Sequence, residues 1–231
     1  MVIRKLDTLI KLAQKRPPKR LVVAYGQDEP SLLAVKEATE LGIIKATVVG
    51  DQEIIEEECK KLNFDCDKIE IKHERDEMSA GRKAVCYINE GEGDILMKGL
   101  ISSDKYLRCI LDKDHGLMLP KATLSHVTLV QVPTYPKLLI ISDAAFIPLP
   151  TIQQKIKITE YVIDTALNLG IEKPKVAIIS FTEKANPKIE SCMMRQLYPK
   201  WATEGKSKMH ILTGLLPWTL QWIKKAQESK E

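Results

Sequence analysis

The sequence predicts an α/β protein with two α/β domains and mainly parallel sheets. Short β-rich runs alternate with longer runs whose apolar residues recur at a helical period, and this alternation is typical of parallel βαβ units. Aromatic residues make up only 5% of the chain, which disfavours sandwiches and barrels built on aromatic layers. A length of 231 residues suits one large domain or two small ones.

The first half of the chain alternates strands and helices after an N-terminal amphipathic helix. In the stretch "EPSLLAVKEATELGI", Leu32, Val35 and Leu41 recur near a 3.6-residue period, and Gly42 is a helix stop signal. Ligands of parallel sheets bind beyond the carboxyl ends of the strands. The predicted strands are residues 21–26, 45–51, 68–73 and 91–99. The predicted helices are residues 29–43, 52–63, 78–89 and 105–111.

The second half has a different pattern. Residues 124–133 and 137–145 read as two strands joined by a short Pro-Thr-Tyr-Pro turn, which predicts an antiparallel hairpin. The stretch "FIPLP" that follows indicates a linker, so we place a domain boundary near Phe146, between a domain of residues 1–145 and a domain of residues 146–231. The later domain begins with a predicted helix at 152–169 and a strand at 175–180.

Composition excludes several classes of partner. The net charge is +4, but acids and bases alternate and no arginine-rich block appears, so we expect no nucleic-acid partner. No apolar run approaches the roughly 18 residues that span a bilayer, and the N-terminus lacks a signal-peptide core, so we expect no membrane partner. The five cysteines form no CxxC pair and the four histidines no cluster, which predicts no metal site and a cytoplasmic location.

The stretch "DILMKGLISSDKYLRCIL" combines the groups needed to bind an anion at a strand-to-helix junction. Ser102 or Ser103 can cap the helix, whose N-terminus attracts phosphate. Gly99 lacks a β-carbon and so could let a ligand approach the backbone. Lys98 adds a charge, and Arg108 can clamp an anion with two parallel hydrogen bonds. The alternative is an ordinary capped junction with solvated cations, and the local pattern leaves both interpretations open.

Several phrases together resemble the phosphate acetyl/butyryltransferase family, and most of all its phosphate butyryltransferase branch. They are "GDILMKGLISSDKYLRCILDKDHGL", "LSHVTLVQVP", "LLIISDAA" and "NLGIEKPKVAIIS". The resemblance implies a cytoplasmic acyltransferase that moves a short acyl group between coenzyme A and inorganic phosphate. It also implies a homodimer of two α/β domains, similar to isocitrate and isopropylmalate dehydrogenases, with coenzyme A as co-substrate and no bound cofactor.

The resemblance also assigns site residues. In the acetyl branch a serine or threonine and an arginine six residues later lie in the cleft between the domains, and this spacing maps onto Ser102 and Arg108 as catalytic residues. Lys98, Gly99 and Ser103 lie in the same phrase and are assigned to phosphate or substrate binding.

Ser125 and Asp143 are two further candidates for substrate binding, at the start and end of the predicted hairpin. Asp143 stands in a phrase that family members usually write Thr-Asp. Its alternative role is to cap the turn that follows. His126 beside Ser125 is expected to be a structural hydrogen-bonding residue.

The C-terminal part departs from the family pattern. Members usually run further, so the resemblance implies a truncated chain with an incomplete second domain and a general base beyond residue 231. The alternative hypothesis is a catalytically impaired paralogue that retains only anion binding or dimerisation. A metal-dependent dehydrogenase on the related fold ranks last, because the sequence has no recognisable set of aspartates for a divalent metal.

Overall fold

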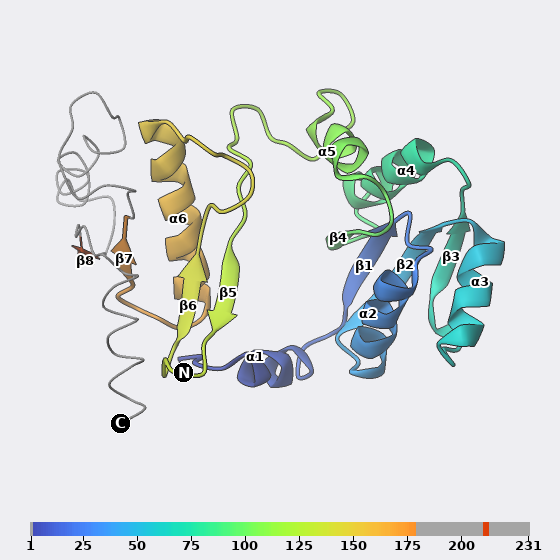
Figure 1. Cartoon of the computed structure of the whole chain (residues 1–231), viewed down its shortest axis with the longest axis horizontal. Coiled ribbons are helices and arrows are strands. Elements are labelled where there is room, and N and C mark those ends of the chain that lie inside the picture. The colour runs from blue at the N-terminus through green and yellow to red at the C-terminus, as the bar shows by residue number, and fades with distance from the viewer. Residues whose placement is uncertain (1, 179–209, 213–231) are drawn as a thin grey trace. The chain divides into compact units, whose positions relative to one another are not determined.

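A computed structural model describes residues 2–178 and 210–212 of the chain, which forms two compact units (Figure 1). The four-stranded unit comprises residues 9–122, and the hairpin unit comprises residues 1–8 with 123–231. The predicted boundary near Phe146 falls inside the hairpin unit, and the division at 145/146 stays a prediction. The predicted strand at 175–180 begins as expected, but residues 179–180 lie outside the described ranges.

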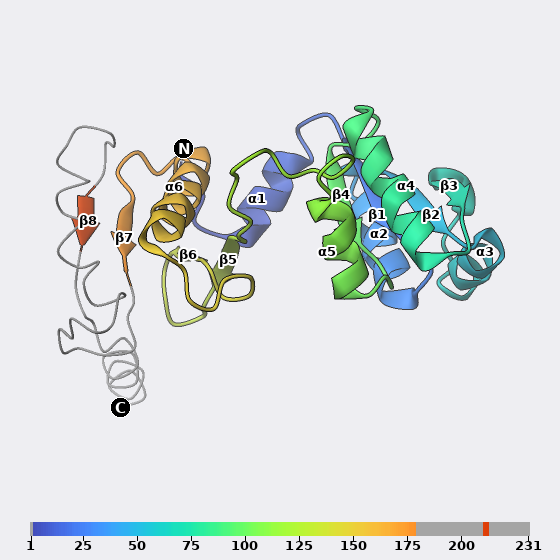
Figure 2. The ribbon, with the colours of Figure 1, turned by 90° about the horizontal axis from the view of Figure 1, so that it is seen from above.

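The four-stranded unit is a parallel sheet with helices on both faces (Figures 1 and 2). The strand order is β3-β2-β1-β4, and each neighbouring pair is parallel, which confirms the predicted βαβ pattern. The elements are α1 (Leu6–Ala13, which begins in the hairpin unit), β1 (Lys19–Ala24), α2 (Glu29–Glu40), β2 (Ile44–Gly50), α3 (Gln52–Lys61), η1 (Cys66–Lys68), β3 (Glu70–His73), α4 (Glu77–Asn89), β4 (Ile95–Lys98) and α5 (Ser103–Leu111).

Alternation along the strands builds a core on each face of this sheet. Val23 and Val48 pack on the face covered by α2 and α3, whereas Val22 and Val49 pack on the face covered by α4. All four valines are at most 1% exposed, as expected for parallel strands buried on both sides. Because α4 covers the opposite face from α2 and α3, the chain crosses the sheet between β3 and β4, which form its two edges.

The helices begin at the ends of the strands with side-chain caps. Asp28, Asp51 and Asp76 accept backbone N–H bonds in the first turns of α2, α3 and α4, and Ser102 does so in α5. Such caps satisfy donors that a helix start leaves without partners. They fix the first turns of these helices near the carboxyl ends of the strands.

The hairpin unit contains the antiparallel pair that the sequence predicted. Strands β5 (Thr128–Gln131) and β6 (Leu138–Ile141) pair in antiparallel register, followed by α6 (Ile152–Asn168). A short parallel pair, β7 (Lys175–Ala177) and β8 (His210–Leu212), completes the described part of this unit. No helix within residues 2–178 or 210–212 has the length and apolar character needed to cross a bilayer.

Candidate functional site

The carboxyl ends of the paired strands β1 and β4 lie side by side. The last residues in register are Ala24 and Lys98. From β1 the chain continues to β2 on one side, whereas β4 lies on the other side, so the direction of the connections reverses between β1 and β4. Ligands of open parallel sheets bind at such a reversal, beyond the strand ends. The predicted junction therefore lies where the topology favours a ligand.

Gly99 holds the two strand ends close together. Its N–H donates to the carbonyl oxygen of Ala24 at 3.0 Å, and the N–H of Leu100 donates to that of Tyr25 at 2.8 Å. A β-carbon at position 99 would lie 2.5 Å from the Tyr25 oxygen and 2.7 Å from Gly26 Cα. Backbone atoms therefore fill the space that the sequence suggested for a ligand. The assignment of Gly99 to phosphate binding stays a prediction.

Ser102, rather than Ser103, is the N-cap of α5. Its backbone is extended, with φ −61° and ψ 146°, and its Oγ accepts a hydrogen bond from Lys105 N at 3.5 Å. The preceding Ile101 is fully buried in the core beneath α4, which anchors the loop. Ser103 is the exposed first residue of the helix. The structure thus decides between two serines that the sequence left open.

Glu77 belongs to this site, although the sequence reasoning did not indicate it. Its Oε1 accepts a hydrogen bond from Ser102 N at 2.6 Å, and its Oε2 pairs with the Lys105 ammonium. The Lys105 ammonium and the Ser102 N–H hold the pKa of the Glu77 carboxyl below its usual value. The only available signal was positional, because α4 and α5 both begin near the strand ends and an acid in the first turn of one can reach the other.

The predicted cations Lys98 and Arg108 are both exposed. The Lys98 ammonium donates to the Gly99 carbonyl oxygen at 3.3 Å. Arg108 Nη2 lies 3.0 Å from Asp104 Oδ2, one turn away, and these two side chains are 67% and 69% exposed. Such an exposed ion pair contributes only about 0–1 kcal/mol. Arg108 can therefore exchange this partner for another anion at small cost.

Ser125 and Asp143 meet in the hairpin unit, in a polar cluster with His126 and Ser142. Ser125 Oγ donates to Asp143 Oδ2 at 3.1 Å, and Ser142 Oγ donates to the His126 carbonyl oxygen at 2.5 Å. The Asp143 side chain is 2% exposed, and its Oδ1 lies 3.4 Å from His126 Nδ1. The two predicted hairpin residues are therefore direct neighbours around a buried carboxylate.

Asp143 caps the turn that follows it. Burial raises the pKa of its carboxyl, but the N–H groups of Phe146 and Ala145 and the Ser125 hydroxyl donate to the carboxylate, and the net shift of the pKa is downward. The two backbone donors lie 2.9 Å from Oδ1. The turn-capping interpretation is confirmed, whereas substrate binding by Ser125 and Asp143 stays a prediction.

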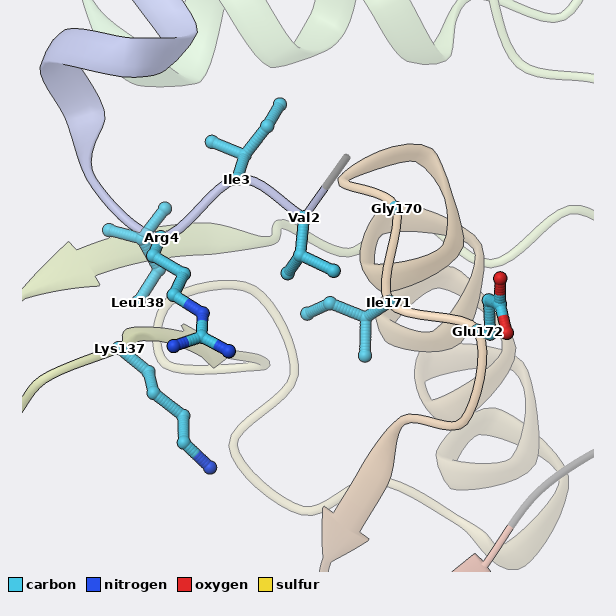
Figure 3. Close-up of a pocket in the computed structure, with 8 residues that line it drawn as sticks. All are labelled: Val2, Ile3, Arg4, Lys137, Leu138, Gly170, Ile171 and Glu172. Carbon is cyan, nitrogen blue, oxygen red and sulfur yellow. The ribbon is translucent and has the colours of Figure 1, made fainter.

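The predicted site residues do not line the pocket of about 510 Å³ in the hairpin unit (Figure 3). Figure 3 shows the charged ends of Arg4 and Lys137 on the same side of this pocket. In residues 2–178 and 210–212, no group of three or more His, Cys, Asp or Glu side chains could hold a metal ion. The pocket is lined by Val2, Ile3, Arg4, Lys137, Leu138, Gly170, Ile171 and Glu172.

Sequence comparisons with a family model and with known proteins point to one family. The family model described as "Phosphate acetyl/butaryl transferase" matches residues 5–82 and 76–212. Phosphate butyryltransferase from Clostridium acetobutylicum is 34% identical over 93% of this chain and 71% of its own length. The enzyme of the same name from Clostridium beijerinckii is 36% identical over 91% of this chain and 70% of its own. Phosphate acetyltransferase from Thermotoga maritima is 32% identical over 98% of this chain and 75% of its own length.

Solved structures share the fold at lower identity. A branched-chain phosphotransacylase from Enterococcus faecalis superposes with a TM-score of 0.71 and 23% identity, covering 92% of this chain and 74% of the other. A phosphotransacetylase from Staphylococcus aureus superposes with a TM-score of 0.65 and 19% identity, covering 90% and 73%. These likenesses concern the fold, and they confirm the predicted fold class.

Proposed function

The chain belongs to the phosphate acetyl/butaryl transferase family, and we propose that it transfers a short acyl group between coenzyme A and inorganic phosphate. The observation that carries this proposal is the start of α5 beside the reversal point of the sheet, where Ser102, Lys98 and Arg108 lie on one short segment. Relatives named phosphate butyryltransferase, at 34% and 36% identity, favour butyryl or another short acyl group.

The reaction makes few covalent demands on the protein. A phosphate oxygen attacks the carbonyl carbon of the acyl thioester, so that a C–O bond forms and the C–S bond breaks. The sulfur leaves as a thiolate and takes up the proton that hydrogen phosphate loses, which yields acyl phosphate and coenzyme A. Rate acceleration then comes from aligning the reactants and stabilising the developing charge.

We assign the proposed roles as follows. Arg108 binds phosphate oxygens with its planar fork, and Lys98 adds a second positive charge. The Ser102 hydroxyl donates to a phosphate oxygen or to the acyl carbonyl oxygen. The N–H of Ser103 lies in the first turn of α5, where a helix start favours phosphate. Gly99 acts indirectly in this scheme, because its N–H is already bonded to the strand beside it.

The proposal extends to the hairpin unit and to the assembly. Ser125 and Asp143 would contact acyl-coenzyme A in this scheme, and their hydrogen bond places the two residues in one polar cluster. A cytoplasmic homodimer with coenzyme A as co-substrate, without nucleic acid or membrane partners, is the assembly we propose. The domain carrying the phosphate loop is residues 1–145 in this scheme.

Arg108→Ala tests the proposed site. Phosphate should stabilise the wild-type chain in proportion to the logarithm of its concentration. Because a charge-assisted hydrogen bond is worth about 1.5–3 kcal/mol, Arg108→Ala should weaken phosphate binding about 10- to 100-fold. Arg108→Lys should keep only part of the phosphate affinity that Arg108→Ala loses, since a point charge cannot reproduce the planar guanidinium fork. The thermal shift in increasing phosphate concentrations measures phosphate binding. The phosphate-dependent release of coenzyme A from butyryl-CoA measures acyl transfer.

Arg16→Ala is the matched control. Arg16 is exposed in the same unit and lies outside the α5 junction, so its removal changes net charge equally. A phosphate-induced shift that is the same in Arg108→Ala and wild type would show that this segment is only a strand-to-helix junction. Binding without turnover of any short acyl-CoA would leave an anion site but overturn the proposed transfer by this chain.

A further inference from the structure

The start of α5 already binds an anion, and that anion is the side chain of Glu77. One carboxylate oxygen accepts the Ser102 N–H at 2.6 Å, and the other pairs with the Lys105 ammonium. These two donors come from the N-cap and from the first turn of the helix. The carboxylate therefore occupies donors of the kind that a phosphate requires.

These two donors belong to the same short segment as the proposed phosphate ligands Ser102 and Arg108. Ser102 is the N-cap, and Lys105 is the residue whose N–H is bonded to the Ser102 hydroxyl. Two anions that share one N–H and one ammonium would also repel each other. A phosphate that uses the Ser102 N–H and the Lys105 ammonium must therefore displace Glu77.

Glu77 can leave without rearrangement of the core. It lies in the first turn of α4, its side chain is 24% exposed, and its partner Lys105 is 42% exposed. The buried α4 residues are Ala80, Gly81, Ala84 and Val85, so the packing of α4 does not depend on this carboxylate. Rotation of one flexible side chain frees both donors.

We propose that Glu77 is a built-in competitor of phosphate and that Lys105 is a phosphate ligand, so that Glu77 sets the phosphate affinity of the site. This inference rests on the proposed function. Displacement of Glu77 transfers the Lys105 ammonium from the carboxylate to the phosphate. If Glu77 instead positions the Ser102 loop for phosphate, removal of its charge should weaken phosphate binding rather than strengthen it.

Glu77→Gln separates the two roles by the direction of the change. The glutamine amide can still accept the Ser102 N–H, but it does not hold the Lys105 ammonium as a charged partner. Because charge assistance about doubles the strength of a hydrogen bond, phosphate affinity should rise roughly 10-fold in Glu77→Gln. Isothermal titration of the full chain with inorganic phosphate measures this affinity directly.

Glu58→Gln is the control for the change in net charge. Glu58 pairs with Lys61 at 2.7 Å on α3, and its side chain is 21% exposed, close to the 24% of Glu77. Glu58→Gln should change phosphate affinity less than about 2-fold, since α3 covers the opposite face of the sheet from α4 and salt screens charges that are not in direct contact. The gain in phosphate affinity of Glu77→Gln beyond that of Glu58→Gln measures the competition between Glu77 and phosphate.

Lys105→Ala gives the second measurement. This variant should weaken phosphate binding about 10-fold. In the double variant Glu77→Gln/Lys105→Ala, most of the rise in phosphate affinity expected for Glu77→Gln should disappear. If Glu77→Gln does not fold, unchanged phosphate affinity in Lys105→Ala overturns the inference by itself.

The outcomes separate this inference from the proposed function. Weaker or unchanged binding in Glu77→Gln overturns the competition, while the proposed phosphate site survives if binding still depends on Arg108. Absence of phosphate binding in both wild type and Glu77→Gln overturns both, because removal of a competitor must expose any site that it blocks.

Discussion

Replacing one of two adjacent serines tests the position at which α5 begins. Ser102 is the N-cap and Ser103 the first helical residue, so Ser102→Ala removes a cap whereas Ser103→Ala does not. The two variants each delete a serine hydroxyl group, at two adjacent exposed positions. Each is therefore the control for the other, and phosphate must be absent from the buffer because Ser102 is also a proposed ligand.

The structure sets the size of the expected effect. Loss of a serine N-cap costs about 0.5–2 kcal/mol. Here the hydrogen bond from Lys105 N to Ser102 Oγ is long, at 3.5 Å, and the Ser102 N–H is separately held by Glu77. Both features place Ser102→Ala in the lower half of the range, at about 0.5–1 kcal/mol. Ser103→Ala should stay within about 0.5 kcal/mol, since alanine is a good helix former.

Urea unfolding followed by far-ultraviolet circular dichroism measures the difference. With a urea dependence of about 2 kcal/mol per molar, Ser102→Ala should lower the midpoint by roughly 0.2–0.5 M. Ser103→Ala should leave it nearly unchanged. A loss of stability in Ser103→Ala equal to or larger than that in Ser102→Ala would refute the assignment of the cap.

Two further perturbations probe the contacts that shape the four-stranded unit. Gly99→Ala should destabilise the chain by about 1–3 kcal/mol in urea unfolding, because the added β-carbon would lie 2.5 Å from the Tyr25 backbone oxygen; a stability equal to wild type would contradict the close approach. The pKa of Asp94 is held below its ordinary 3.8 by the Arg20 side chain and backbone N–H, so its stabilising effect is complete above that value and is lost as pH falls toward the folded pKa. The stability difference between wild type and Asp94→Asn should therefore be constant near neutral pH and shrink below about pH 4, and a difference independent of pH would contradict the ion pair.

Much of the fold follows from local sequence pattern. The order of strands and helices in the first half, the parallel sheet and the later hairpin were all predicted, because period and stop signals are properties of a few neighbouring residues. Element ends shifted modestly: α5 begins at Ser103 rather than Lys105, since the cap residue fixes the helix start. The strand order was not predicted, because it depends on which face each helix covers.

The features of the candidate site also fall into those that the sequence predicts and those that only the tertiary structure decides. By itself, the sequence determined that a serine pair, two cations and a glycine follow a buried strand, and that this phrase resembles one family of acyltransferases. Only the tertiary structure decided that Ser102 is the cap, that backbone fills the space beside Gly99, and that Glu77 reaches the start of α5 from another helix. The physical reason is distance along the chain. Glu77 and Ser102 are 25 residues apart, and their contact exists only because packing brings the starts of two helices together at one edge of the sheet.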